Sequence, residues 1–167
     1  MAGITIAINL RNYQNSMLET IANYRLIADN LHTSAQPTVD EIEKLKEAGI
    51  DIVINLARPD SPNAISNEAQ LVENNGMRYI PIPVDFENPT LTDLKKFFAT
   101  MNENTNQCKL VHCARNWRVS CFVYLYRVIQ QGCDNRTAKE DMLSVWQPDK
   151  IWQSFIDESL SNSGSMK

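Results

Sequence analysis

One short segment of the chain combines a thiol, two guanidinium groups and a hydroxyl. It reads His112-Cys113-Ala114-Arg115-Asn116-Trp117-Arg118-Val119-Ser120. An apolar run at 109–112 precedes it and a strongly helical stretch follows it, so we expect a loop between a strand and a helix. Successive backbone N–H groups and a helix N-terminus at such a loop attract anions. The same positive field favours a thiolate over a thiol. The segment therefore predicts a nucleophilic Cys113 beside an anion-binding loop.

Two further side chains of the segment suit an anionic ligand. The planar fork of Arg118 matches a phosphoryl group in bidentate fashion, and Ser120 can donate a hydrogen bond to the sulfur. Arg115 is a second cation that either contacts the ligand or points to solvent. A lone cysteine after an apolar strand is more often an inert core residue. The combination with arginine in one short loop is what favours chemistry here, with Ala114, Asn116 and Trp117 as further anion-binding positions.

The elements that must position this loop alternate along the chain. Hydrophobic periodicity predicts strands over 24–28, 51–56, 79–84 and 109–112, and helices over 38–48, 67–75, 92–102, 118–131, 135–145 and 148–159. Thr38 followed by Glu41 forms a capping box, and Gly49 follows that helix. Strands separated by single helices predict an α/β fold in three layers, with a mostly parallel central sheet flanked by helices. Ligands bind at the carboxyl ends of such strands, where the Cys113 loop lies.

The length predicts one domain. A chain of 167 residues is long enough for a single substantial core. We expect the domain to span 23–160. An N-terminal extension at 1–22 contains a candidate helix at 15–21, and a polar, flexible tail covers 161–167.

Composition excludes several classes of function. The net charge of −4 argues against a general nucleic-acid binder. The apolar run at 4–10 is too short to span a membrane. The four cysteines gather between 108 and 133 without a CxxC pair, and the chain has two histidines, so neither a disulfide framework nor a metal site is expected. We therefore expect a reduced, cytoplasmic protein without a metal or other cofactor.

The Cys113 loop resembles the signature loop of the protein tyrosine phosphatase superfamily, in which His-Cys is followed by Arg and then Ser or Thr. More closely, residues 21–160 resemble a bacterial family of small, dual-specificity-like phosphatases that also occur fused to beta-lactamase-like hydrolases. The matching stretches are NYRLIADNLHTSAQPT (23–38), GIDIVINLARPDS (49–61), MRYIPIPVDFENPT (77–90), LVHCARNWRVSCFVYLYRV (110–128) and VWQPDKIWQSFI (145–156).

The resemblance implies a dual-specificity phosphatase-like fold and a cysteine-dependent phosphomonoester hydrolase. Cys113 would form a phosphocysteine intermediate on a phosphorylated protein or small molecule. Protonation of the leaving group requires a general acid, and the match to the superfamily's Asp is Asp85, with Glu87 as the alternative. His112 would tune the thiolate indirectly. Arg58 follows another strand and would either contact the substrate or be a surface charge.

The spacing between the two central residues departs from the superfamily. Four residues separate Cys113 from Arg118 where the common pattern has five, so Val119 occupies the usual Arg position while Ser120 stands where the pattern places it. Four-residue spacing is typical of rhodanese-like sulfurtransferases, which would carry a persulfide on Cys113. A non-catalytic binder of phosphorylated ligands is the third hypothesis.

Overall fold

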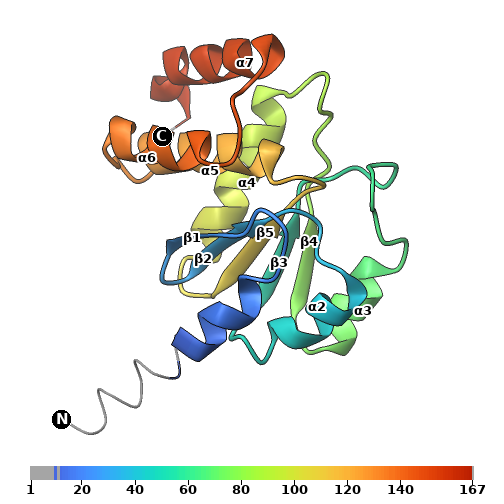
Figure 1. Ribbon diagram of the computed structural model, residues 1–167. Coiled ribbons are helices and arrows are strands. Elements are labelled where there is room, and N and C mark those ends of the chain that lie inside the picture. The colour runs from blue at the N-terminus through green and yellow to red at the C-terminus, as the bar shows by residue number, and fades with distance from the viewer. Residues whose placement is uncertain (1–9, 11, 167) are drawn as a thin grey trace, which may run out of the picture.

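The structure of the protein is a computed structural model that describes residues 10 and 12–166. Residues 1–9 and 11 of the expected N-terminal extension, and residue 167 of the expected tail, lie outside the described residues. Strands β1 to β5 cover Arg25–Ala28, Leu31–Ser34, Ile52–Asn55, Arg78–Pro81 and Lys109–His112. Helices α2 to α7 cover Val39–Leu45, Glu68–Asn74, Leu91–Glu103, Trp117–Ile129, Asn135–Leu143 and Lys150–Ser161. Figure 1 shows their arrangement.

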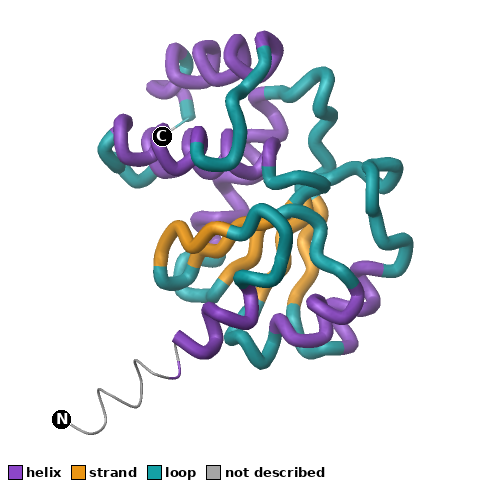
Figure 2. Tube along the Cα trace, in the orientation of Figure 1, coloured by secondary structure: helices purple, strands orange, loops and turns teal. Residues whose placement is uncertain are grey.

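The five strands form one sheet in the order β1-β2-β5-β3-β4. β1 pairs with β2 in antiparallel fashion, whereas β2, β5, β3 and β4 run parallel to one another. The predicted, mostly parallel sheet is thus confirmed. The register sets Ser34, His112, Asn55 and Pro81 beside one another at the strand ends. The loops after these strands, drawn in teal in Figure 2, therefore begin at one edge of the sheet.

Helices cover both faces of the sheet, as Figure 1 shows. Helices α4 to α7 lie on one face, and their core is rich in aromatic side chains, among them Phe97, Phe122 and Trp152. Helices α2 and α3 lie on the other face, over a smaller core that includes Ile42 and Val72. The predicted three-layer α/β architecture is confirmed. The sheet fixes where the loops at its edge begin, and the two cores hold the helices that follow those loops.

Three elements show how local chemistry sets their bounds. Helix α2 begins after Thr38, where the predicted capping box with Glu41 is present. β4 is shorter than the strand predicted over 79–84 because Pro81 and Pro83 lack an N–H donor, although Ile82 still donates to Asn55. β2 was not predicted: its sequence, Leu-His-Thr-Ser, is mostly polar although all four residues are buried.

Both ends of the described chain rest on the domain. Residues 12–18 are helical, overlapping the candidate helix at 15–21, and Leu18 and Ile21 are buried in the smaller core. At the other end a 3-10 helix spans Ser163–Ser165, and Met166 is buried against the larger core. Among the described residues, none of the helices combines the length and the apolar character that crossing a membrane requires.

Candidate active site

The loop that carries Cys113 connects β5 directly to α5. The Cys113 side chain is only 1% exposed. Backbone contacts hold the loop against the segment after β2. Arg115 and Ala35 form an isolated antiparallel β-bridge. The backbone N–H of Gln36 also donates to the carbonyl of Ala114 at 3.4 Å. Helix α5 begins four residues after Cys113, at Trp117. The predicted strand, loop and helix are all present, and the thiol lies at the base of the loop.

Asn116 allows this short loop to turn into the helix. It precedes α5 with a left-handed backbone (φ 65°), a conformation that asparagine tolerates better than most residues. Its side-chain amide donates to the carbonyl of Asn23 at 2.8 Å and to the hydroxyl of Thr33 at 3.1 Å. Asn23 in turn donates to the carbonyl of Arg115 at 3.1 Å. Asn116 is fully buried and holds the loop in place from behind.

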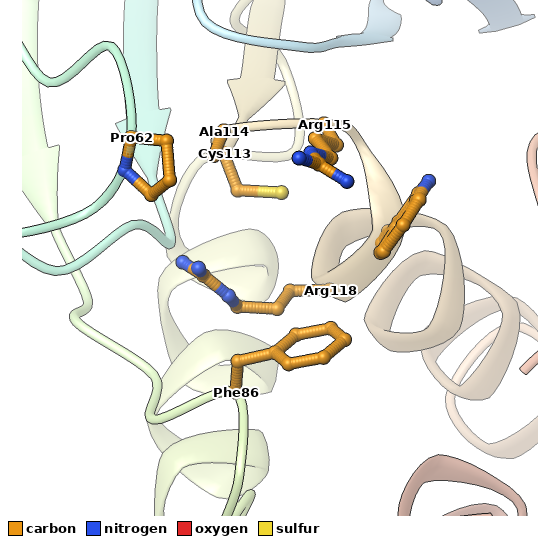
Figure 3. A pocket seen from close by; sticks show the side chains of 7 residues that line it. Pro62, Phe86, Cys113, Ala114, Arg115 and Arg118 are labelled. Carbon is orange, nitrogen blue, oxygen red and sulfur yellow. The ribbon is translucent and has the colours of Figure 1, made fainter. Parts of the chain in front are cut away.

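Arg118 reaches the same pocket as Cys113 despite the four-residue spacing. Figure 3 shows its guanidinium group between Cys113 and the ring of Phe86, and its Cζ atom lies 5.8 Å from the centre of that ring. Nη1 donates to the carbonyl of Leu56 at 3.1 Å and Nη2 donates to Ser61 Oγ at 3.3 Å. The side chain is buried (7% exposed), and its Nε–H has no partner in the described part of the chain. A buried, unpartnered cationic donor is a ready contact for an anion.

The pocket itself encloses about 240 Å³. Its lining combines the cysteine loop with apolar side chains from other loops: Pro62, Phe86, Cys113, Ala114, Arg115, Trp117 and Arg118. Four of the five predicted anion-binding positions therefore line it, and Asn116 supports the loop from behind. The Trp117 ring stacks on Trp146 at 4.7 Å with an interplanar angle of 2°, while Arg115 Cζ lies 4.9 Å from the centre of the Trp117 ring.

Asp85 lies in the loop after β4, at the predicted edge of the sheet, but beside the pocket rather than in its lining. Its Oδ2 forms an ion pair with Arg58 Nη1 at 3.1 Å, and its Oδ1 accepts the backbone N–H of Glu87 at 3.0 Å. The side chain is 45% exposed. The next residue, Phe86, does line the pocket. Arg58 also pairs with Asp60, so it holds the predicted acid in place outside the pocket.

Ser120 lies in the first turn of α5. Its hydroxyl donates to the carbonyl oxygen of Trp117 at 2.8 Å. Donation to the Cys113 sulfur, which the sequence suggested, would require that hydroxyl to rotate away from Trp117. Ser120 therefore remains a predicted thiolate donor, and the structure gives its hydroxyl a different acceptor.

His112 faces a buried polar network that includes a residue missed from sequence. Its Nε2 lies 3.0 Å from a carboxylate oxygen of Glu68, the first residue of α3. Burial alone would raise the pKa of Glu68, but the adjacent His112 ring and hydrogen bonds from Gln36 and Tyr79 outweigh it and hold that pKa below its ordinary value. A glutamate at the start of a short helix is ordinarily solvent-exposed, so the sequence carried no signal that singled out Glu68.

The sheet order and the loop that joins β5 to α5 agree with the dual-specificity phosphatase-like fold expected from the sequence. The family of DSP-PTPase phosphatases fused to NAD⁺ kinase matches residues 11–157. The chain therefore belongs to this family of dual-specificity and tyrosine phosphatases, which confirms the resemblance inferred from the sequence and the assignment to the phosphatase class of hydrolases. A comparison with curated proteins gave no match.

Solved structures support the same assignment. A protein of the phosphatase family DUF442 from Shewanella putrefaciens CN-32 is 34% identical, with a TM-score of 0.81 over 89% of this chain and 97% of that one. P. aeruginosa TpbA, solved in complex with pTyr, is 16% identical with a TM-score of 0.68, over 86% and 90% of the two chains. PTPMT1, solved in complex with PI(5)P, is 18% identical with a TM-score of 0.71, over 85% and 97%. The last two show a shared fold.

Proposed function

We propose that this protein hydrolyses phosphomonoesters through a phosphocysteine intermediate on Cys113. The observation that carries the proposal is the position of Arg118. Its side chain lines the same pocket as the buried thiol, and its buried Nε–H has no partner among the described residues. Backbone N–H groups of the loop and the N-terminus of α5 supply further positive field for a phosphoryl group.

In the first step, the Cys113 thiolate attacks phosphorus and a P–S bond forms. The bond between phosphorus and the ester oxygen breaks, and that oxygen takes a proton from Asp85. Arg118 and the loop N–H groups hold the non-bridging oxygens as charge builds on them. Since Asp85 is paired with Arg58 outside the pocket, its loop must first release that pair and carry the protonated carboxyl toward the leaving oxygen.

In the second step, water attacks phosphorus and the P–S bond breaks. Asp85, now a carboxylate, accepts a proton from the water, and inorganic phosphate leaves with the Cys113 thiolate restored. The substrate is a phosphorylated protein or small molecule. The apolar walls formed by Pro62 and Phe86 suit the uncharged part of such an ester.

The proposal is tested with p-nitrophenyl phosphate. We expect wild type to release phosphate with turnover and Cys113→Ser to lose activity while still binding inorganic phosphate. Brief acid quenching of wild type should trap a phosphate adduct on the Cys113 peptide, detected by mass spectrometry. Cys133→Ser, at a partly exposed cysteine outside the pocket lining, serves as the matched control and should retain full activity.

The spacing of Cys113 and Arg118 favours one competing hypothesis, a rhodanese-like sulfurtransferase. The direct contrast is phosphate release from p-nitrophenyl phosphate against sulfur transfer from thiosulfate to cyanide. Rapid sulfur transfer without phosphate release would replace the phosphatase proposal. Tight phosphate binding with no turnover by wild type, matched by Cys113→Ser, would instead identify a non-catalytic binder of phosphorylated ligands.

A further inference from the structure

Glu68 is buried at the point where four elements meet. Its side chain is 4% exposed. One carboxylate oxygen lies 3.0 Å from His112 Nε2 on β5 and accepts from Gln36 Nε2 at 2.7 Å. The other accepts from Asn55 Nδ2 on β3 at 2.8 Å and from the Tyr79 hydroxyl on β4 at 3.0 Å. Three hydrogen-bond donors and the His112 ring converge on one buried carboxylate, so the site is built for a negative charge.

Glu68 is ionised at neutral pH, because its pKa lies below the ordinary value. Tyr79 remains a donor, since burial and then the nearby Glu68 charge raise the pKa of its hydroxyl. A buried anion held by neutral donors alone is costly, and a cationic or strongly polarised partner offsets that cost. Within the described part of the chain, two titratable side chains contact this carboxylate, His112 and Tyr79.

His112 links this carboxylate to the nucleophile. It is the last residue of β5, its side chain is completely buried, and Cys113 follows it directly. Neither ring nitrogen meets hydrogen-bond geometry with another described residue, but Nε2 lies 3.0 Å from a carboxylate oxygen of Glu68. A ring that faces a carboxylate through Nε2 carries its proton there. The carboxylate thus fixes the tautomer of His112 and orients the ring next to the reactive thiol.

We propose that Glu68 is a positioning residue that acts through His112 to keep Cys113 in its thiolate form at neutral pH. The inference rests on the proposed function, because it takes Cys113 as the nucleophile. Other charged groups lie around both sites: Arg115 and Arg118 line the Cys113 pocket, and Arg58 lines a groove next to Glu68. Arg58 is engaged by Asp60 and Asp85, so it does not neutralise Glu68 in place of His112.

The test is the pH dependence of Cys113 alkylation by iodoacetamide, followed on the Cys113 peptide by mass spectrometry. We expect Glu68→Gln to raise the midpoint of the alkylation profile by about one pH unit. On the acid side of the profile, this shift corresponds to an alkylation rate about tenfold lower. Two control variants should leave the midpoint unchanged. Glu73→Gln makes the same change on the exposed face of α3. Tyr79→Phe removes one hydrogen bond to Glu68 without altering the contact with His112.

A double-mutant cycle separates this role from a structural one. His112→Gln should raise the midpoint as Glu68→Gln does, and adding Glu68→Gln to His112→Gln should change it no further. An unchanged midpoint in Glu68→Gln, or additive shifts in the double variant, would overturn the proposal. If Glu68→Gln does not fold, nitrogen NMR of the wild-type His112 ring decides: a proton on Nε2 supports the proposal and a proton on Nδ1 refutes it.

The alkylation profile does not depend on turnover, so it distinguishes the two proposals. A shifted midpoint in Glu68→Gln with no phosphate release by wild type would reject the phosphatase mechanism and retain the role of Glu68. Phosphate release by wild type with an unshifted midpoint in Glu68→Gln would retain the phosphatase mechanism and reject the role of Glu68.

Discussion

Asp85 meets two opposing demands. As the proposed general acid it must reach the leaving oxygen, yet its ion pair with Arg58 holds it outside the pocket lining. The pair is about half exposed, and ion pairs of this kind contribute little because water screens them. Releasing it therefore costs little. In the proposed mechanism Arg58 therefore holds the loop of the acid outside the pocket, which is neither the substrate contact nor the solvated surface charge that its sequence position suggested.

The role of Asp85 predicts a dependence on the leaving group. We expect Asp85→Asn to reduce kcat by about 10²-fold or more for poor leaving groups, because they need protonation, and far less for good ones such as p-nitrophenol. The measurement is kcat across a series of aryl and alkyl phosphates. Glu87→Gln is the matched control and should leave the series unchanged. Equal losses for all substrates in Asp85→Asn would assign the acid elsewhere or indicate a structural effect.

Ser61 predicts an effect on anion affinity. Its hydroxyl oxygen accepts from Arg118 Nη2 and from the backbone N–H of Arg58. Without it Arg118 loses one tether, and we expect Ser61→Ala to weaken phosphate binding by about fivefold, the equivalent of roughly 1 kcal/mol for one hydrogen bond. Calorimetric titration with inorganic phosphate measures this. Ser66→Ala, exposed in the same connection, should bind as wild type does, and an unchanged affinity in both would refute the tether.

At the scale of elements, the junction between β5 and α5 depends on the left-handed Asn116. Asn116→Gly removes the two side-chain hydrogen bonds but keeps the backbone conformation, whereas Asn116→Ala loses the bonds and adds about 1–2 kcal/mol of strain. We expect stability to fall in the order wild type, Gly, Ala, measured by urea denaturation. Asn63 also has a left-handed backbone but is exposed. The loss of stability in Asn63→Ala therefore measures the cost of backbone strain by itself. Equal stability of the two Asn116 variants would contradict this account.

The elements also show what the sequence could and could not predict. The β5–loop–α5 unit was predictable because an apolar run, a short polar loop and a helical face occur next to one another. β2 was missed because His32, Thr33 and Ser34 are polar, and only their position between β1 and β5 explains their burial. Spacing alone left Arg118 ambiguous, since its reach depends on acceptors about sixty residues away in the sequence, Leu56 and Ser61.

At the scale of the whole molecule, alternating strands and helices specify the topology, and the topology brings distant residues together. The parallel strands end at one edge, so the loops that carry Arg58, Asp85 and Cys113 begin there. Sequence therefore sufficed to predict that these loops begin at one edge of the sheet. It did not identify Glu68, because that residue is functional only through side chains on three different strands and a loop, and its own neighbours in the chain are unremarkable.

The same network predicts how acid affects global stability. The pKa of Glu68 in the folded protein lies below its ordinary value of 4.5. Its ionised form therefore stabilises the fold fully at pH values above 4.5. This stabilisation is lost as pH falls through the folded-state pKa. We expect Glu68→Gln to lower the free energy of unfolding by about 1–3 kcal/mol at pH 7. The difference in stability between wild type and the variant should narrow steadily below about pH 4.5. Urea denaturation of both proteins from pH 7 to pH 3 measures it, and a constant gap would contradict the prediction.

The stacked rings of Trp117 and Trp146 have an optical consequence. Two indoles in parallel contact share their electronic excitation, and their joint absorption and emission respond to small changes of angle. Trp117 lines the pocket and lies next to the Arg115 cation, so on the proposed function a bound phosphate that draws Arg115 away would alter the field on the pair. The third tryptophan, Trp152, is fully buried and supplies a steady background. With phosphate bound as proposed, tryptophan fluorescence and circular dichroism would report pocket occupancy without any added label.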